Sequence, residues 1–423
     1  MKVVIVGNGI AGSEAAFHLR DLRPDAEITL LSIETGPAYD PCTLPYVLSR
    51  ELPRHVAFFR AAKEYQRARI TLMPGYRATG IDVASRVVHT VDDTNLPYDR
   101  LILAPGGRPI TPPIKGLDLP GVFPCKTLCD VDRLARHEGR RVVVIGSGAV
   151  GIEAAEALRK RNYEVVILEL LDWILPAMLD EDAARLLQDA LRRHDVIALT
   201  NTRARGILGR GRVEAVCTDC EEIPCDTVVL AAGVTPDRGL AEDAGIRVGR
   251  GILVNSRMET SVPGIFACGD CAEPHDALTG ERCLYALKPN AIDQARVAAR
   301  AVAGLPTSYR GAFAFARAHF FDTHAASFGL TSKTLPPQVE AEIQERREGG
   351  SYLRVLLLEG RIIGAHGVGS LIKDLGSLMA SALRQDDIQE LVREWAQVCS
   401  IKSAWPWTHR QLGRALGLRL PLD

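Results

Sequence analysis

Short runs of aliphatic and β-branched residues recur along the chain, and a helical pattern follows each of the early ones. Residues 3–6 form such a run, and helix-forming residues at 13–20 lead to a second apolar run at 28–31. The same order returns at 142–145 and 165–168, again with a helical stretch between the two runs. Strands that alternate with helices in this way predict an α/β protein with doubly wound parallel sheets.

The pattern changes in the second half of the chain. A further apolar run lies at 228–233, the segment 264–270 is expected to be a strand that ends in Gly-Asp at a turn, and an alanine-rich helix is expected over 291–303. From about residue 310 the sequence is typical of a β-rich segment, with strands expected at 352–358 and 361–365, followed by helices. We therefore expect a separate α+β domain at the C-terminal end.

Glycines at fixed spacing follow the first strand directly, in the order Gly7-Asn8-Gly9-Ile10-Ala11-Gly12. In such a turn the first glycine allows a tight bend and the second lets a pyrophosphate approach the backbone. The third lets the helix pack on the sheet. An acid near the end of the next strand would bind a ribose hydroxyl. Glu34, two residues beyond Ser32, is the candidate.

A second turn of the same kind follows the strand at 142–145, in the order Gly146-Ser147-Gly148-Ala149-Val150-Gly151. Glu169 lies 18 residues after Gly151, at the expected ribose-binding position. An acid there accepts from a 2′-hydroxyl and repels a 2′-phosphate, which favours NAD over NADP. Two such turns in one chain predict two bound dinucleotides.

A single cysteine, Cys42, lies in the stretch from Tyr39 to Tyr46, just before an expected helix with Pro45 in its first turn. The charge-rich segment that follows is expected to be helical to about Arg69. The backbone N–H groups at a helix N-terminus stabilise a thiolate. Cys42 is therefore either a redox nucleophile beside a cofactor or a packed residue near one.

The bulk composition narrows the class of protein. With 423 residues the chain has room for two to four domains, and 51 basic residues nearly balance 52 acidic ones. No nucleic-acid partner is expected from this balance. No export signal or membrane-spanning run is visible, so a cytoplasmic location is expected, and the ten cysteines are expected to be reduced.

Some cysteines have the C-x2-C spacing of metal sites. These are Cys217 and Cys220, with Cys225 nearby, and Cys268 with Cys271. A zinc or iron–sulfur site needs four converging ligands, and both groups fall on strands or turns of the dinucleotide domains. We expect no metal site.

Along nearly its whole length the chain resembles the FAD-dependent pyridine nucleotide-disulfide oxidoreductases. The two glycine turns, Gly269-Asp270 and the segment 361–365 carry the resemblance. It implies a discontinuous FAD-binding domain at 1–115 and 240–309, an NAD-binding domain at 116–239, and a C-terminal interface domain at 310–423. Such proteins commonly dimerise through the last of these.

The resemblance also implies the residues that contact each cofactor. For FAD these are Gly7, Asn8, Gly9, Ile10, Ala11, Gly12, Glu34, Cys42, Ala78, Ala104, Gly106, Gly269, Asp270 and Ala291. For NAD(H) they are Gly146, Gly148, Ala149, Val150, Gly151, Glu153, Glu169 and Gly233. Proline replaces the usual threonine in the Ala104-Pro105-Gly106 segment.

Two residues are candidates for a catalytic role. Cys42 would lie against the flavin and change oxidation state. Glu153, one turn into its helix, would orient the nicotinamide, and the alternative is a solvated helix residue. His319 and His324 are expected to pack within the C-terminal domain or its interface.

The sequence lies between branches of the family. One cysteine at position 42 is similar to NADH oxidases and coenzyme A-disulfide reductases, whereas the strand end at 30–34 resembles rubredoxin and ferredoxin reductases. The segment 395–400 lacks the tyrosine that coenzyme A-disulfide reductases carry, and an amphipathic basic tail follows at 405–420. This tail is expected to dock on a partner or a membrane surface, or to pack on its own dimer.

Three functions remain open. The favoured one is an NAD-reductase subunit that exchanges electrons with an iron–sulfur protein. The NAD-reducing flavin subunit of phenylglyoxylate dehydrogenase-type complexes is a family member with this role. The second is a stand-alone NADH oxidase, or a coenzyme A-disulfide or persulfide reductase, that uses Cys42. The third is a flavoprotein that senses NADH without being an enzyme. The protein is expected to be a homodimer or part of a larger complex.

Overall fold

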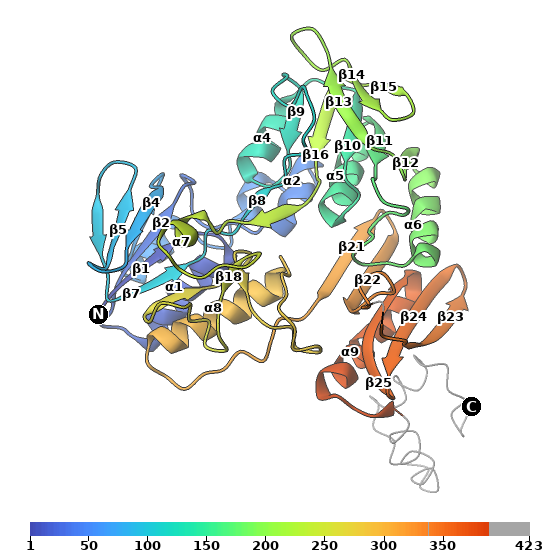
Figure 1. The fold of residues 1–423 in the computed structure, drawn as a ribbon. Coiled ribbons are helices and arrows are strands. Elements are labelled where there is room, and N and C mark those ends of the chain that lie inside the picture. Colours follow the sequence, from blue (N-terminus) through green and yellow to red (C-terminus); the bar gives the residue numbers. More distant parts are fainter. Residues whose placement is uncertain (337, 389–423) are drawn as a thin grey trace, which may run out of the picture. The chain divides into compact units, whose positions relative to one another are not determined.

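The computed structural model describes residues 1–336 and 338–388 (Figure 1). The segment 395–400 and the tail at 405–420 therefore lie outside the described residues. Contacts divide the chain into two compact units. The first comprises 1–47, 52–110 and 234–313, and the second comprises 48–51, 111–233 and the chain from Ala314 onward.

The first unit is built on a five-stranded parallel sheet in the order β19-β7-β1-β2-β3. Its strands are β1 (Lys2–Val6), β2 (Glu27–Ser32), β3 (Ile70–Pro74), β7 (Arg100–Leu103) and β19 (Ile265–Ala267). The last four residues of β1 are all buried because parallel sheets are covered on both faces. Helices α1 (Ile10–Leu22) and α8 (Lys288–Val302) pack against each other, although 265 residues lie between the end of α1 and the start of α8.

Smaller elements complete the first unit. A three-stranded antiparallel sheet contains β4 (Ala78–Asp82), β5 (Val87–Thr90) and β6 (Asn95–Pro97). Strands β8 (Gly107–Pro109) and β17 (Val234–Pro236) form an antiparallel pair. The remaining elements are the helices α2 (Leu44–Leu48), α3 (Ala62–Arg67) and α7 (Gly239–Asp243), the 3-10 turns η1 (Pro41–Thr43) and η2 (Arg54–Ala57), and the paired strands β18 (Ile252–Leu253) and β20 (Ala272–Glu273).

The second unit contains another five-stranded parallel sheet, in the order β12-β11-β10-β16-β9. Its strands are β9 (Val122–Pro124), β10 (Arg141–Ile145), β11 (Glu164–Leu168), β12 (Val196–Leu199) and β16 (Thr227–Leu230). Its helices are α4 (Leu128–Arg136), α5 (Ala149–Lys160) and α6 (Glu181–Arg193). Between β12 and β16 the chain forms a three-stranded sheet of β13 (Ala204–Leu208), β14 (Ala215–Thr218) and β15 (Glu222–Pro224).

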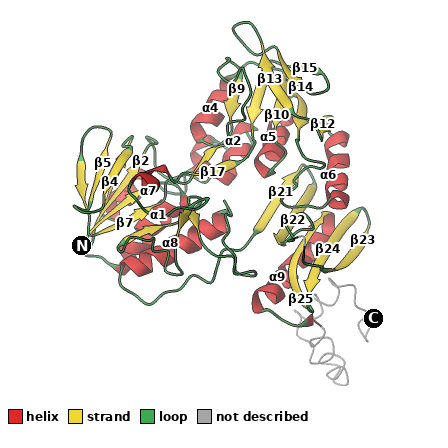
Figure 2. Cartoon of the chain, in the orientation of Figure 1, coloured by secondary structure: helices red, strands yellow, loops and turns green. Residues whose placement is uncertain are grey.

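The chain after residue 313 forms an antiparallel sheet in the order β21-β22-β25-β24-β23 (Figure 2). Its strands are β21 (Phe315–Phe320), β22 (Thr323–Gly329), β23 (Glu342–Glu348), β24 (Ser351–Leu358) and β25 (Arg361–Val368). The 3-10 turn η3 (Gly369–Asp374) and helix α9 (Leu375–Arg384) pack against β22 and β25. Within this unit, β21 also contacts α5 and β25 contacts α6.

One expectation of local structure was wrong. The stretch after Cys42 was expected to be helical to about Arg69, but it contains only α2, η2 and α3, all short. Pro53 precedes η2 in an extended conformation, and Phe58 then forms a β-bridge with Tyr39. The bridge draws the chain back alongside the approach to Cys42, so a continuous helix cannot form.

The two compact units do not correspond one-to-one to the three expected domains. Most of residues 1–115 and 240–309 belong to the first unit, while most of residues 116–239 and the chain from Ala314 onward belong to the second. The exact three-domain boundaries stay a prediction. No helix among the described residues is long and apolar enough to cross a membrane.

Candidate active site

The first glycine turn joins β1 to α1. Gly7 has a φ of +105°, and a Cβ there would lie 2.1 Å from the carbonyl oxygen of Ala104. A Cβ on Gly12 would lie 1.7 Å from the carbonyl oxygen of Gly7. Gly9, the N-cap of α1, has no neighbour within 4 Å of an added Cβ. The outer glycines are therefore required by close packing, and the middle one borders open space.

The second glycine turn repeats this arrangement between β10 and α5. Gly146 has a φ of +106°, and its Cβ would lie 2.4 Å from the carbonyl oxygen of Ala231. A Cβ on Gly151 would lie 2.1 Å from the carbonyl oxygen of Gly146, while Gly148 again borders open space. Each turn thus forms a cradle at a helix N-terminus, where backbone N–H groups bind a pyrophosphate. The residues present fit two dinucleotides.

Gly269 lies beside the first cradle, although it comes from a distant part of the chain. The N–H of Gly269 donates to Oε1 of the buried Gln294 at 2.8 Å, and a Cβ on Gly269 would meet Ala11 at 2.9 Å. Asp270 therefore follows the strand β19 next to the start of α1. Ala291 is buried in the first turn of α8.

Ala104 and Gly106 lie just after β7, where Gly106 has a φ of +78° and open space beside it. Ala78 is the first residue of β4, opposite Thr90 in the small antiparallel sheet. The structure thus places Ala104 beside the glycine turn and Ala78 in a separate sheet of the same unit. In the second unit, Gly233 has a φ of +101° and follows β16.

Glu34 belongs to a small polar group after β2. Its carboxylate accepts a hydrogen bond from the Tyr39 hydroxyl at 3.1 Å, and its own N–H donates to Oγ of Ser32 at 3.1 Å. These contacts fix the half-buried acid two residues beyond the strand end, at the position where the sequence predicts a residue that binds a ribose hydroxyl.

Reasoning from sequence missed Tyr65. This buried residue of α3 donates from its hydroxyl to Oδ1 of Asn8 at 3.0 Å, and it accepts the N–H of Ala38 at 3.2 Å. One hydroxyl therefore ties the glycine turn to the loop that leads to Cys42. The available signal was an aromatic residue alone on a short, highly charged helix.

Cys42 is exposed and lies within η1, immediately before α2. Asp40 caps this turn: its Oδ1 accepts the N–H of Cys42 at 3.0 Å, and its Oδ2 pairs with the ammonium of Lys288, the first residue of α8. A carboxylate and an ammonium from segments 248 residues apart thus hold the backbone at the thiol.

Glu169 is buried at the end of β11, and both of its carboxylate oxygens accept hydrogen bonds. Oε2 accepts from the N–H of Ser147 at 3.1 Å and from the Ser147 hydroxyl at 2.5 Å, and Oε1 accepts from the N–H of Leu171 at 2.9 Å. The acid is thereby bonded directly to the second glycine turn.

Glu153 lies on α5 beside a second acid. Burial, with a smaller contribution from the charge of Glu156, raises the pKa of Glu153 to about 7. His319 on β21 lies between the two acids, 3.9 Å from Glu153 Oε1 and 3.6 Å from Glu156 Oε2. Lys160 pairs with Glu156 at 2.7 Å. His319 thus contacts the helix of the predicted NAD site rather than only its own domain.

Five other cysteines differ from Cys42 because they are buried. Burial raises the pKa of Cys125, Cys225, Cys268 and Cys283 to about 12, and it also raises that of Cys271. Such thiols are poor nucleophiles and poor metal ligands. Over residues 1–336 and 338–388, no group of three or more His, Cys, Asp or Glu side chains could hold a metal ion.

The sequence profile described as pyridine nucleotide-disulphide oxidoreductase matches residues 1–301. The chain belongs to this family. It is 31% identical over 392 residues to an NADH oxidase of Methanocaldococcus jannaschii, which covers 87% of this chain and 88% of the relative.

Two further family members are similar over most of their length. The epsilon subunit of NADH-dependent phenylglyoxylate dehydrogenase of Aromatoleum evansii is 29% identical over 396 residues, covering 92% of this chain and 93% of that subunit. The structure of an NAD-dependent persulfide reductase from A. fulgidus superposes with a TM-score of 0.90 at 28% identity, covering 98% and 82% of the two chains.

Membership confirms several predictions. The α/β fold with two dinucleotide-binding domains, the assignment as a flavin-dependent NAD(P)H oxidoreductase, and the cofactors FAD and NAD(H) are all confirmed. The individual site residues stay predictions, and their contacts are those given above.

The two cradles can be tested separately. Gly9→Ala and Gly148→Ala should both fold, because an added Cβ meets nothing at either position. Gly9→Ala should weaken FAD retention, whereas Gly148→Ala should keep FAD and raise KM for NADH about tenfold or more, since each methyl fills the space for one pyrophosphate. Flavin content and steady-state kinetics measure both effects. Equal flavin content in the two variants would contradict the assignment of the cradles.

Glu153 predicts a pH-dependent stability. A carboxyl whose pKa is higher in the folded than in the unfolded protein favours folding at low pH, and this contribution is lost as the pH rises to about 7. Glu153→Gln should therefore be more stable than the parent by about 1–3 kcal/mol near pH 8, with little difference near pH 4. Denaturant unfolding at several pH values measures this. Glu164→Gln, an exposed change on β11, is the control and should show no such trend.

Proposed function

We propose that the protein transfers a hydride between NADH and FAD and exchanges the electrons with a redox protein, which we take to be an iron–sulfur protein. The observation that carries the first part is the pair of open glycine cradles on equivalent parallel sheets. When bound, the nicotinamide and the flavin supply the hydride chemistry, and the protein binds and orients them.

We assign roles to the residues around the cradles. Gly7, Gly9 and Gly12 would hold the FAD pyrophosphate, and Gly146, Gly148 and Gly151 would hold that of NADH. Glu169, fixed by Ser147, would accept from a ribose 2′-hydroxyl and repel a 2′-phosphate, which supports NADH over NADPH. Glu153 would orient the nicotinamide.

Two lines support an electron-transfer partner. The phenylglyoxylate dehydrogenase relative is named as one subunit of a larger enzyme, and it matches this chain over nearly its whole length. The segment 395–400 also lacks the tyrosine that the thiol-reducing branch carries. The balanced reaction is NADH plus two oxidised one-electron carriers, giving NAD⁺, a proton and two reduced carriers.

A second candidate function follows from Cys42. Its thiol is exposed at a turn, beside a carboxylate that pairs with Lys288. Such a thiol could reduce a disulfide or persulfide, as the name of the A. fulgidus neighbour suggests for that protein. For a disulfide, NADH and one proton would give NAD⁺ and two thiols.

The preference for NADH is tested by anaerobic titration of the purified flavoprotein. NADH should bleach the flavin absorbance within one turnover, and NADPH should do so at least tenfold more slowly because Glu169 repels the 2′-phosphate. If neither nucleotide bleaches the flavin, the proposed hydride transfer is wrong.

Cys42→Ser separates the two candidate functions. If electrons leave through a protein carrier, the variant should keep the NADH-driven reduction of an artificial dye within about twofold. If the thiol carries the electrons, NADH-dependent reduction of coenzyme A disulfide or persulfide should be present in the parent and absent in the variant. Cys129→Ser, an exposed cysteine of α4, is the matched control. A parent that reduces such a thiol substrate would overturn the preference for a protein carrier.

A further inference from the structure

The loop between β11 and α6 folds back onto the second glycine turn. It begins after Glu169, and the N–H of Leu175 donates to the carbonyl oxygen of Ser147 at 3.1 Å. Leu175 is buried and has a φ of +50°, in the left-handed region that side chains avoid. Trp173 closes the loop internally by donating from Nε1 to the carbonyl oxygen of Leu179 at 2.8 Å. A strained loop of this kind needs support from elsewhere.

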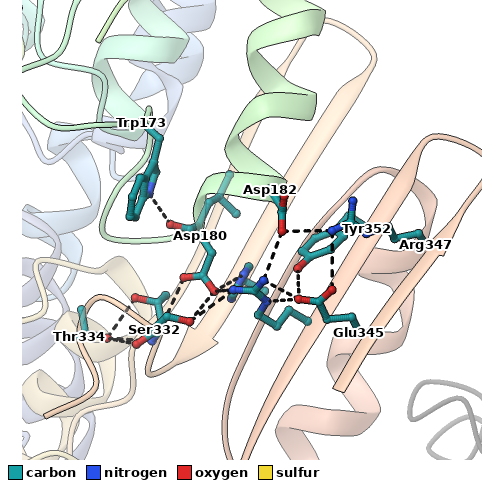
Figure 3. Close-up of polar contacts among 12 residues, drawn as sticks. Trp173, Asp180, Asp182, Ser332, Thr334, Glu345, Arg347 and Tyr352 are labelled. Carbon is teal, nitrogen blue, oxygen red and sulfur yellow. Dashed lines mark hydrogen bonds and ion pairs between the residues drawn. The ribbon is translucent and has the colours of Figure 1, made fainter. Parts of the chain in front are cut away.

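The loop ends at Asp180, the N-cap residue of α6. Aspartate at this position usually accepts a hydrogen bond from its own helix, but Asp180 makes no such bond. Its Oδ2 instead accepts from the Ser332 hydroxyl at 2.8 Å and from Arg354 Nη1 at 2.5 Å, and its Oδ1 accepts the N–H of Ser332 at 3.2 Å. Figure 3 shows the side chains of Asp180 and Ser332 directed toward one another.

The partners of Asp180 are themselves well fixed. Thr331 and Thr334 hold the turn around Ser332, with the N–H of Thr331 donating to Oγ1 of Thr334 at 2.8 Å. Arg354, largely buried on β24, also binds Glu345 at 2.5 Å. Burial alone would raise the pKa of Asp180, but the neighbouring His366, Ser332 and Arg354 together hold it far below its ordinary value. The carboxylate is therefore charged across the working pH range.

A second contact joins the same two segments. Nζ of Lys333, the residue after Ser332, lies 4.8 Å from the centroid of the Trp173 ring. Residues 332–333 thus bind both the middle and the end of the loop that starts at Glu169. Both contacts lie within the second unit.

We propose that the C-terminal sheet, acting through Asp180, holds the loop from Glu169 to Leu179 in the conformation that binds NADH. Asp180 is then a positioning residue, and the inference rests on the proposal that NADH occupies the second cradle. If only a fraction of molecules has the loop in the binding conformation, the apparent affinity for NADH is the intrinsic affinity multiplied by that fraction. We call the contacts that residues 332–333 and Arg354 make with this loop the Asp180 clamp. Loss of the clamp should therefore raise KM for NADH, whereas kcat and FAD content should not change.

The test uses Asp180→Asn and Ser332→Ala in the full-length flavoprotein, with Arg347→Met as control. Arg347 binds Asp182 and Glu345 in the same network, and within the described part of the chain it forms no hydrogen bond or ion pair with Asp180 (Figure 3). Asp180→Asn and Ser332→Ala should each raise KM for NADH about fivefold or more, with kcat within twofold and a full complement of FAD. The control should leave KM unchanged. The double variant should be no worse than the stronger single variant, because both act on one contact.

The outcomes separate this inference from the function on which it rests. A parent protein whose flavin NADH does not bleach would overturn the proposed function itself. A parent that is bleached normally, with variants that retain its KM, would overturn only the clamp. If Asp180→Asn does not fold, Ser332→Ala and Lys333→Met decide the question. Both remove a contact to the loop, and both keep the ion pair between Asp180 and Arg354. A fall in kcat and in flavin content together with a rise in KM would indicate general destabilisation and would also contradict the clamp.

Discussion

The close approach of a strand-end carbonyl to a glycine is the constraint on which each glycine cradle depends. Ala104 brings its oxygen to Gly7, and Ala231 brings its oxygen to Gly146, at distances that leave no room for a side chain. Each contact fixes where the neighbouring parallel strand ends relative to the helix N-terminus. The space beside the middle glycine is then set by the sheet, so it is present before any ligand binds. Side-chain contacts such as Tyr65 to Asn8 and Glu169 to Ser147 are attached to these turns and stabilise them.

The second unit buries several acids, and each has a different set of neighbours. Glu169 accepts backbone and hydroxyl donors from Ser147 and Leu171, so it stays close to the nucleotide turn. Glu156 pairs with Lys160 and lies near His319, while Asp180 binds Arg354. Buried charges need such partners because desolvation is costly. Two of these three acids, Glu156 and Asp180, have neighbours on the C-terminal sheet. That sheet therefore contributes electrostatically to the predicted nucleotide-binding half.

Local patterns predicted the parts of the fold that depend on neighbouring residues. The strands that flank each glycine turn, the helices after them and Glu169 all follow from short sequence signals, and the structure places them accordingly. The break after Cys42 was missed because it depends on the Tyr39–Phe58 bridge, which no local propensity encodes. Tyr65, Lys288 and Asp180 were missed for a related reason. Their partners lie 57, 248 and 152 to 186 residues away, and one sequence carries no signal for such pairs.

The edge strand β9 gives the insertion of the nucleotide-binding segment a simple geometry. In the first sheet the equivalent edge strand, β19, comes last in the chain, whereas β9 comes before β10 and pairs with β16, the last strand of its sheet. The chain therefore enters and leaves this sheet on neighbouring strands. The flanking strands β8 and β17 are also paired, and Arg108 binds Asp237 across them. Adjacent ends are the condition under which a domain can be spliced into a loop of another. The segment from β9 to β16 can therefore lie between β8 and β17 without changing the strand order of the first sheet.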